Sequence, residues 1–294
     1  MRGNMTRAET IALYINYLFF LILIISMILP VLMLIARSVS SERAILTGTV
    51  GILPDLQNLK FDSYLYVVGN KGFMQGFAIT VTVTLLGSFV AMVVTSHAAY
   101  AVSKPYLRGR KVMLLFSIFT MIFSGGLIPT YLVINALGLL NTFHILWMAG
   151  VFSTMNMLIL KSTFESVPVE LEEAAVIDGA GQFSMLWRIY LPVSKAALAV
   201  IALFYAVEYW NNYHTSMMFT TMPQLRSLQL VLKDIIYSAS DVFLELHGVH
   251  AYGEITAQST VAASVIVATI PILAAYPFLQ KHFAKGVMIG SVKG

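Results

Sequence analysis

Long uncharged stretches of apolar residues alternate along the chain with short charged segments. The uncharged stretches cover residues 10–36, 72–103 and 112–160. Each of the first two is long enough for one helix that crosses a hydrocarbon core, which takes about 20 residues. The third is too long for one helix. Its glycines 125–126, Pro129 and the segment 135–141 are typical of turns, and they predict two transmembrane helices of about 20–25 residues joined by a short turn.

Two further apolar helices are predicted in the C-terminal half, over about residues 193–213 and 255–280. Pro271 and Pro277 are expected to kink the second of them. The hydrophobic pattern therefore predicts an all-α polytopic membrane protein with six transmembrane helices and both termini on the same side. We expect residues 1–294 to form a single transmembrane domain.

The composition excludes several other classes of protein. Hydrophobic residues make up 58% of the chain and charged residues 11%, and the mean hydropathy is +0.81. Soluble domains are about 45–50% apolar and about 25% charged. A soluble enzyme, a nucleic-acid-binding module and a disordered scaffold are therefore excluded. The chain has no cysteine, so it forms no disulfide, thiolate nucleophile or cysteine-ligated metal site.

The distribution of Lys and Arg predicts the orientation in the membrane. The short connector 104–111 carries four cations and no anion. Because short loops rich in Lys and Arg stay on the cytoplasmic side, both termini are predicted to be cytoplasmic. The outer loops are then about residues 38–71 and 214–254. With Arg37 at the edge of the first loop, six cations lie on the outer side and 12 of the 18 Lys and Arg residues on the cytoplasmic side.

The segment between the predicted fourth and fifth helices, about residues 165–192, is too polar to lie in lipid. Pro168 indicates the start of a helix whose first turns carry several glutamates, as the helix dipole favours. Gly179 and Gly181 permit the left-handed conformation of a sharp turn. A second short helix is predicted over about residues 182–190. We call this predicted helix–turn–helix segment, residues 165–192, the elbow.

The elbow carries a sequence signature. It has the residues of the EAA motif of ABC importer permeases at the same spacing: Glu173-Ala174-Ala175-x3-Gly179-x9-Ile189-x-Leu191-Pro192. The chain resembles this family over its whole length, and most closely the maltose-type, binding-protein-dependent carbohydrate permeases. The C-terminal residues 276–294 look like the end of the second permease subunit in that family. Residues 123–131 and 137–141 resemble a branch that imports oligosaccharides released from polysaccharides.

The resemblance implies a type I ABC importer permease fold and a mechanism. In that family the elbow docks into a groove of a cytoplasmic ATPase subunit, and ATP-driven closure of the ATPase pair switches the path between outward and inward access. Glu173 would then provide an anchoring charge, and Gly179 the turn. Close packing and attachment to the fifth helix would come from Ala174, Ala175, Ile189, Leu191 and Pro192.

The resemblance also implies the partners. These are a second permease subunit, two ATPase subunits, an extracytoplasmic solute-binding protein and an oligosaccharide, in the lipid of a bacterial inner membrane and without nucleic acid. The chain itself has no G-x-x-x-x-G-K-[ST] phosphate-binding loop. We therefore expect no bound cofactor and no catalytic residue in this chain, and ATP and Mg²⁺ on the partner ATPase.

Five polar or aromatic residues are candidates for the lining of a sugar path: Asn156, Glu208, Trp210, Asn211 and Tyr213. An acid in an apolar helix faces protein or water rather than lipid, amides bond sugar hydroxyls, and aromatic faces stack on pyranose rings. Two alternatives stay open. The end of the fifth helix can lie in the aromatic belt at the outer interface, and Asn156 can serve in bonding between helices.

Other functions are less favoured by the sequence. An ABC importer of a non-sugar solute differs from the leading hypothesis in the substrate alone. An ion-coupled secondary transporter would need paired acids or bases in the spans and usually an internal repeat, whereas Glu208 alone lies deep in a predicted span. His247 and His250 are spaced like metal ligands, but Gly248 between them argues against a helix, and we expect no metal site.

Overall fold

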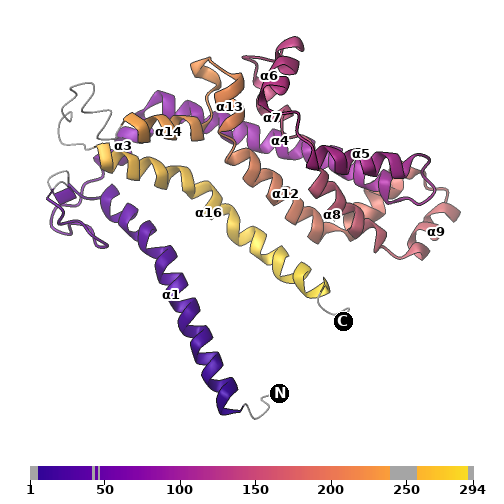
Figure 1. Cartoon of the computed structure of the whole chain (residues 1–294), viewed down its shortest axis with the longest axis horizontal. Coiled ribbons are helices and arrows are strands. Elements are labelled where there is room, and N and C mark those ends of the chain that lie inside the picture. Colours follow the sequence, from indigo (N-terminus) through magenta and orange to yellow (C-terminus); the bar gives the residue numbers. More distant parts are fainter. Residues whose placement is uncertain (1–5, 42–43, 46, 239–256, 291–294) are drawn as a thin grey trace. The chain divides into compact units, whose positions relative to one another are not determined.

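The computed structural model describes residues 6–41, 44–45, 47–238 and 257–290. Every regular element in this described part is helical, as Figure 1 shows, which confirms the all-α prediction. The chain divides into two compact units. One consists of residues 1–71 with 232–269, and the other of residues 72–231 with 270–294.

The first unit is dominated by helix α1 (Arg7–Ser38), which confirms the helix predicted over residues 10–36. It begins at a capping box. The Thr6 side chain accepts a hydrogen bond from the Glu9 backbone N–H at 3.3 Å, and the Glu9 carboxylate accepts one from the Thr6 N–H at 2.7 Å. None of the most apolar part of α1 is buried within the chain. A helix surrounded by lipid can show such a surface because its backbone bonds are internal.

A short helix and part of two longer ones complete the first unit. Helix α3 (Asp62–Gly69) is joined to α16 (Ala257–Gly290) by a hydrogen bond from Ser63 Oγ to Ser259 Oγ at 2.9 Å. Helix α16 corresponds to the predicted sixth helix, but it extends ten residues beyond the expected end at 280 and continues through both of its prolines. Helix α14 (Leu228–Ser238) runs from the second unit into the first.

The second unit contains helix α4 (Lys71–Ser103), which confirms the predicted second helix. The stretch 112–160, in contrast, does not form two helices. It is divided among four: α5 (Arg110–Ile122), α6 (Leu127–Ala136), α7 (Phe143–Met148) and α8 (Thr154–Glu165). Gly126, Gly138 and Asn141 have φ values of +87°, +68° and +57°. A right-handed helix cannot pass through such left-handed residues, so the chain turns at each of them.

Helix α12 (Lys195–Trp210) packs on α4 through an aromatic side chain held between two glycines. The ring of Tyr209 lies so close to Gly87 and Gly150 that a Cβ atom at these positions would stand 2.6 Å and 3.2 Å from it. The Tyr209 hydroxyl donates to the backbone oxygen of Trp147 at 2.6 Å. One turn earlier, the Tyr205 hydroxyl bonds Thr95 Oγ1 at 2.6 Å. Two short helices, α13 (His214–Phe219) and η2 (Pro223–Leu225), follow α12.

Fewer helices in the described part qualify as candidate membrane spans by length and composition than the six that the sequence predicts. Two helices are long and apolar enough to span a membrane, Glu9–Ser38 and Lys71–Ser103. Two bent helix pairs also qualify if each counts as one span. They are Arg110–Ile122 with Leu127–Ala136, bent by 117°, and Gln182–Val193 with Lys195–Trp210, bent by 88°. The described helices therefore give between two and four candidate spans.

The packing of Tyr209 predicts the effect of a small substitution. Gly87→Ala places a methyl group 2.6 Å from Tyr209 Cζ, so the ring must move away from α4. Overpacking of this kind lowers the free energy of unfolding by about 1–3 kcal/mol. We expect a lower thermal unfolding midpoint in detergent, followed by tryptophan fluorescence.

The control is Gly125→Ala, because a Cβ atom there would meet only Pro129 Cβ at 4.0 Å. We expect its midpoint to match the wild type. Equal midpoints for Gly87→Ala and Gly125→Ala would show that the ring moves aside without cost.

Candidate functional site

The elbow forms the predicted helix–turn–helix. Its first helix is α9 (Val169–Ile177), with Pro168 at the N-cap and Glu170 and Glu172 in the first turn. Its second arm consists of α10 (Gln182–Met185), the π-helical turn η1 (Leu186–Tyr190) and α11 (Leu191–Val193). The acids of the first turn lie where the positive end of the helix dipole favours them.

The turn between the two arms depends on Gly179, whose φ is +75°. The Gly179 N–H bonds the Val176 oxygen at 3.0 Å, and the Ala180 N–H bonds the Ala175 oxygen at 2.8 Å. These two bonds form a Schellman motif, which ends a helix at a left-handed residue. Gly181 does not share the left-handed conformation that the sequence suggested. Its φ is −72°, and it lies directly before α10.

The second arm changes its helical register before it turns into α12. The Leu191 N–H bonds the oxygen of Leu186, five residues earlier, as in a π-helix. Pro192 follows directly, and it has no N–H to donate. The helical arm therefore continues to Val193, three residues beyond the predicted end, and the chain then bends by 88° into α12.

The elbow has a buried face and an exposed apolar face. Met185, Leu186 and Tyr190 are buried in the core of the second unit. Phe183 and Trp187, on the same arm of the elbow, are 69% and 44% exposed. Three large apolar side chains, with Ile177 at 86%, are therefore open on the outside of the elbow.

The residues of the signature fall into two groups. Glu173, Ala174, Gly179 and Pro192 are exposed. Ala175 is buried, and Ile189 and Leu191 are partly buried against the same core. Within the described residues the Glu173 carboxylate makes no ion pair.

A buried lysine connects the elbow to the end of α4. The Lys104 Nζ lies 2.7 Å from Glu172 Oε2 and 2.6 Å from the Tyr190 hydroxyl. The Tyr190 hydroxyl in turn donates to Glu172 Oε2 at 2.7 Å. The Lys104 side chain is 7% exposed. We call these three residues the Lys104 node.

Aromatic rings surround the ammonium group of the Lys104 node. Its nitrogen is 4.0 Å from the ring centroid of Tyr190 and 4.7 Å from that of Tyr100. These cation–π contacts partly replace the water that burial removes. The same two rings pack edge to face, with Phe164 against both. The Tyr100 hydroxyl also donates to Gln182 Oε1 at 2.7 Å, which ties α10 to α4.

The electrostatics of the Lys104 node favour a charged glutamate. Burial by itself raises the pKa of the Glu172 carboxyl. Hydrogen bonds from Lys104 and Tyr190, the charge of Lys104 and a bond from Tyr106 together outweigh burial, so the pKa lies below its ordinary value. A hydrogen-bonded ion pair is therefore the stable form of the node at neutral pH.

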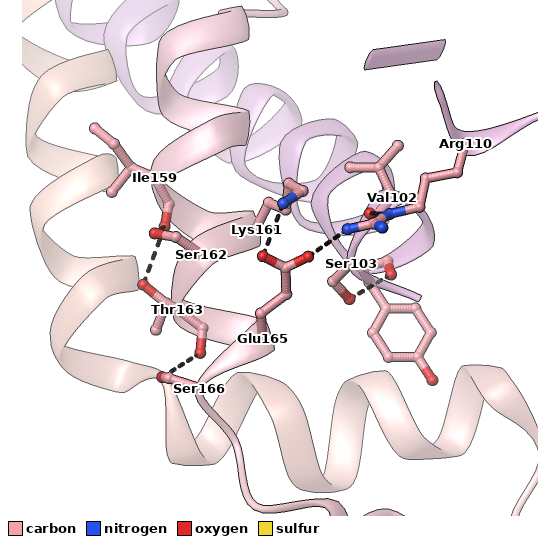
Figure 2. Close-up of polar contacts among 10 residues, drawn as sticks. Val102, Ser103, Arg110, Ile159, Lys161, Ser162, Thr163, Glu165 and Ser166 are labelled. Atoms are coloured by element: carbon pink, nitrogen blue, oxygen red, sulfur yellow. Dashed lines mark hydrogen bonds and ion pairs between the residues drawn. The ribbon is translucent and has the colours of Figure 1, made fainter. Parts of the chain in front are cut away.

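A second ionic cluster holds the beginning of the elbow. Figure 2 shows the Glu165 carboxylate between Lys161 and Arg110, at 2.7 Å and 2.5 Å. The same guanidinium donates from Nε to the backbone oxygen of Val102 at 2.8 Å. Arg110 thus links the ends of α4 and α8. Two of the four cations of the connector 104–111 therefore bind neighbouring elements.

Sequence reasoning missed the Lys104 node. The connector cations indicated the orientation in the membrane, and Glu172 was one of several acids in a first helical turn. Nothing in the spacing pairs Lys104 with Glu172, which is 68 positions away. The one available signal was that both residues lie in segments expected on the cytoplasmic side, the connector 104–111 and the elbow.

The structure places the five candidates for the sugar path in different surroundings. Glu208 and Asn211 are exposed on one face of α12. Asn156 is buried in the first turn of α8, and Trp210 is buried with its ring edge to face against Phe77. Tyr213 lies beyond the end of α12 and is half-buried.

Metal ligands do not gather anywhere in the part of the chain that the structure describes, where no group of three or more His, Asp and Glu could hold an ion. His247 and His250 lie outside the described residues.

Comparison with known proteins identifies the class to which this fold and this elbow belong. Residues 108–289 match the family described as "Binding-protein-dependent transport system inner membrane component". The chain belongs to this family. It is accordingly a multi-pass permease of the inner membrane and a transport subunit of an ABC importer, in which ATP is bound by the partner ATPase.

Individual relatives cover nearly the whole chain. Protein LplC of Bacillus subtilis (strain 168) is 38% identical over 267 residues, which are 91% of this chain and 90% of LplC. The polygalacturonan/rhamnogalacturonan transport system permease protein YtcP of the same organism is 36% identical over 278 residues, 95% of this chain and 96% of YtcP. A crystal structure of a bacterial ABC transporter involved in the import of the acidic polysaccharide alginate has a TM-score of 0.87. Its sequence identity is 30%, and the match covers 96% of this chain and 99% of that chain.

The lowered pKa of Glu172 predicts how the Lys104 node responds to pH. Because the folded pKa lies below the ordinary value of 4.5, the ion pair stabilises the folded state fully above about pH 4.5 and is lost as the pH falls through the folded pKa. Glu172→Gln should therefore unfold at a lower temperature than the wild type at pH 7. We expect this difference to shrink and vanish below pH 4.5.

Glu170→Gln removes an exposed carboxylate from the same turn of α9 and controls for the change of net charge at pH 7. A difference between wild type and Glu172→Gln that stayed constant down to the most acidic pH would contradict a contribution from the ionised carboxylate.

Proposed function

We propose that the chain forms one half of the path by which an ABC importer takes up oligosaccharides released from acidic polysaccharides. The elbow with the EAA signature carries the coupling part of this proposal. The names of two relatives support the substrate class. YtcP is described as a permease for polygalacturonan and rhamnogalacturonan, and the similar solved structure belongs to an importer of alginate. All three are polymers that contain uronic acids.

In this proposal the elbow is the surface to which an ATPase subunit binds. Glu173 is exposed and makes no ion pair within the described part of its own chain, so its charge is available to a partner. The exposed apolar side chains Ile177, Phe183 and Trp187 supply surface that another protein can cover. Gly179 shapes the turn, while Ala175, Ile189, Leu191 and Pro192 hold the elbow on its core and on α12.

The proposed assembly follows the type I importers. It contains this permease, a second permease subunit, two ATPase subunits and an extracytoplasmic solute-binding protein. We propose six crossings and cytoplasmic termini for this chain, since the connector 104–111 concentrates positive charge beside the elbow. Closure of the ATPase pair would move the elbows and switch the path between its outward and inward states.

For the sugar path itself we propose the exposed face of α12. Phe204, Val207, Glu208 and Asn211 follow one another at helical spacing and are all exposed. The Asn211 amide nitrogen donates to the Val207 oxygen at 2.9 Å, which leaves its side-chain oxygen to accept from a sugar hydroxyl. The buried surroundings of Asn156 and Trp210 favour roles in packing for these two residues.

The coupling role of the elbow predicts that distortion of its turn detaches the ATPase. In Gly179→Asp a side chain is forced onto a residue with φ of +75°, so the turn is strained although nothing stands within 4 Å of the new Cβ. We expect the variant permease to insert normally but to retain severalfold less ATPase on co-purification. Hydrolysis stimulated by the binding protein should fall in parallel.

Gly181→Asp is the matched control. It adds the same charge two residues away, at a glycine with φ of −72° and equally open space. It should retain the ATPase as the wild type does. Equal retention by all three proteins, with equal stimulated hydrolysis, would remove the support for a coupling role.

The substrate class predicts which loaded binding proteins stimulate the complex. The permease, its partner subunits and the ATPase are reconstituted in liposomes, and ATP hydrolysis is measured with binding proteins loaded with oligogalacturonate, alginate oligomers, maltodextrin or a non-sugar solute such as an osmolyte. We expect the uronic-acid oligomers to raise hydrolysis above the basal rate. Stimulation by the osmolyte or by maltodextrin alone would overturn the proposed substrate class and leave the coupling role intact.

A further inference from the structure

We propose that Lys104 is a positioning residue that makes the elbow and the end of α4 move as one body. The inference rests on the coupling role proposed above for the elbow. It starts from the Lys104 node, in which one ammonium group joins three segments that are far apart in the sequence: the residue after α4, the first turn of α9 and the end of η1.

The Lys104 node connects the two arms of the elbow on either side of its exposed turn. The covalent connection between α9 and the second arm passes through the exposed turn at Gly179. The Tyr190 hydroxyl bypasses that turn, because it donates directly to Glu172 Oε2 at 2.7 Å. A displacement of α9 is therefore passed to the second arm by a short hydrogen bond as well as through the exposed turn.

The Lys104 node also connects the elbow to a candidate membrane span. Lys104 directly follows α4, and the span Lys71–Ser103 ends one residue before it. Its ammonium group binds both arms of the elbow, at 2.7 Å on Glu172 and 2.6 Å on Tyr190. If the elbow slid along the end of α4, these bonds would break and leave a buried charge without a partner, which is strongly unfavourable.

The packing around the Lys104 node does not provide the same connection. Tyr100 and Tyr190 meet edge to face with their centroids 5.0 Å apart, and Phe164 lies 5.5 Å from Tyr190. Such edge-to-face pairs are worth about 0.5–1.5 kcal/mol and leave no charge unpaired when they shift. The hydrogen bond from Tyr100 to Gln182 ties the second arm alone to α4 and does not reach α9. Loss of the ammonium group should therefore leave the elbow folded but loosen its link to α4.

The test uses the complete importer in liposomes, with its partner permease, ATPase subunits and loaded binding protein. Lys104→Met removes the charge and keeps an unbranched apolar stem. We expect the variant to retain the ATPase on co-purification and to hydrolyse ATP, but to import less sugar for each ATP. The ratio should fall by about fivefold or more, the lower end of typical coupling between distant sites.

Lys161→Met is the matched control. Lys161 also pairs with a glutamate at 2.7 Å, but that partner, Glu165, lies four residues away in the same helix. The substitution removes the same charge without separating two elements, so it should leave the ratio of sugar to ATP unchanged. Lys104→Arg keeps the charge and can still stack on the rings, and it should restore most of the ratio that Lys104→Met loses.

Two further variants keep the proposal testable should Lys104→Met fail to fold. Tyr190→Phe removes one oxygen atom and keeps the ring, and it should lower the ratio to a smaller extent. Glu172→Gln should lower it as well. Combined with Tyr190→Phe, it should have less than the sum of the two effects, because both act through the same node.

The proposal is overturned if Lys104→Met imports as much sugar per ATP as the wild type, or if Lys161→Met lowers the ratio equally. Failure of the coupling role is recognised separately, from the retention of the ATPase by the Gly179→Asp variant. If Gly179→Asp loses the ATPase while Lys104→Met keeps a normal ratio, the elbow couples and Lys104 does not position it. If Gly179→Asp changes nothing, the coupling role itself is wrong.

Discussion

A backbone N–H or C=O group that loses its helical partner needs another one, and this constraint governs how the chain can change direction. Within a helix the peptide groups satisfy one another, whereas every helix end leaves N–H and C=O groups that need other partners. The end of α9 solves this with the two bonds of the Schellman motif at Gly179. Before α12, the Leu191 N–H is paired in the π-helical turn η1. Pro192, which follows, has no N–H that needs a partner. At the turn of the elbow the N–H groups of Gly179 and Ala180 therefore keep partners within the elbow itself.

The same constraint explains which elements the amino-acid sequence predicts well. Helices α1 and α4 begin and end within a few residues of the expected bounds, because a long uncharged stretch has one low-energy solution in lipid. The turn at Gly179 was likewise visible, since it depends on the local conformational freedom of a glycine. The division of residues 112–160 into four helices was not. The segment 135–141 is typical of a turn, but nothing in the hydrophobic pattern shows that the chain turns separately at Gly126, Gly138 and Asn141.

Contacts between distant residues are the part of the site that no local pattern reveals. Lys104 and Glu172 each had a sufficient local explanation, one as a signal for orientation and the other as a favourable charge in a first helical turn. Both explanations remain compatible with the structure, but neither states that the two groups meet. Tyr190 lies between them, because its hydroxyl accepts a hydrogen bond from Lys104 and donates one to Glu172. A charge can thus help to orient a segment in the membrane and later become a buried element of its fold.

The EAA signature contains both exposed residues and residues that pack into the core beneath them. Glu173 and Ala174 are exposed, whereas Ala175, Ile189 and Leu191 pack into the core that also contains Tyr190. Because packed cores deform little, a force on the exposed residues is carried into that core rather than absorbed by it. The turn at Gly179 has no such packing, because nothing lies within 4 Å of a Cβ position there. A rigid response therefore requires a connection that bypasses the turn, and within the described residues the Lys104 node has the geometry to provide it.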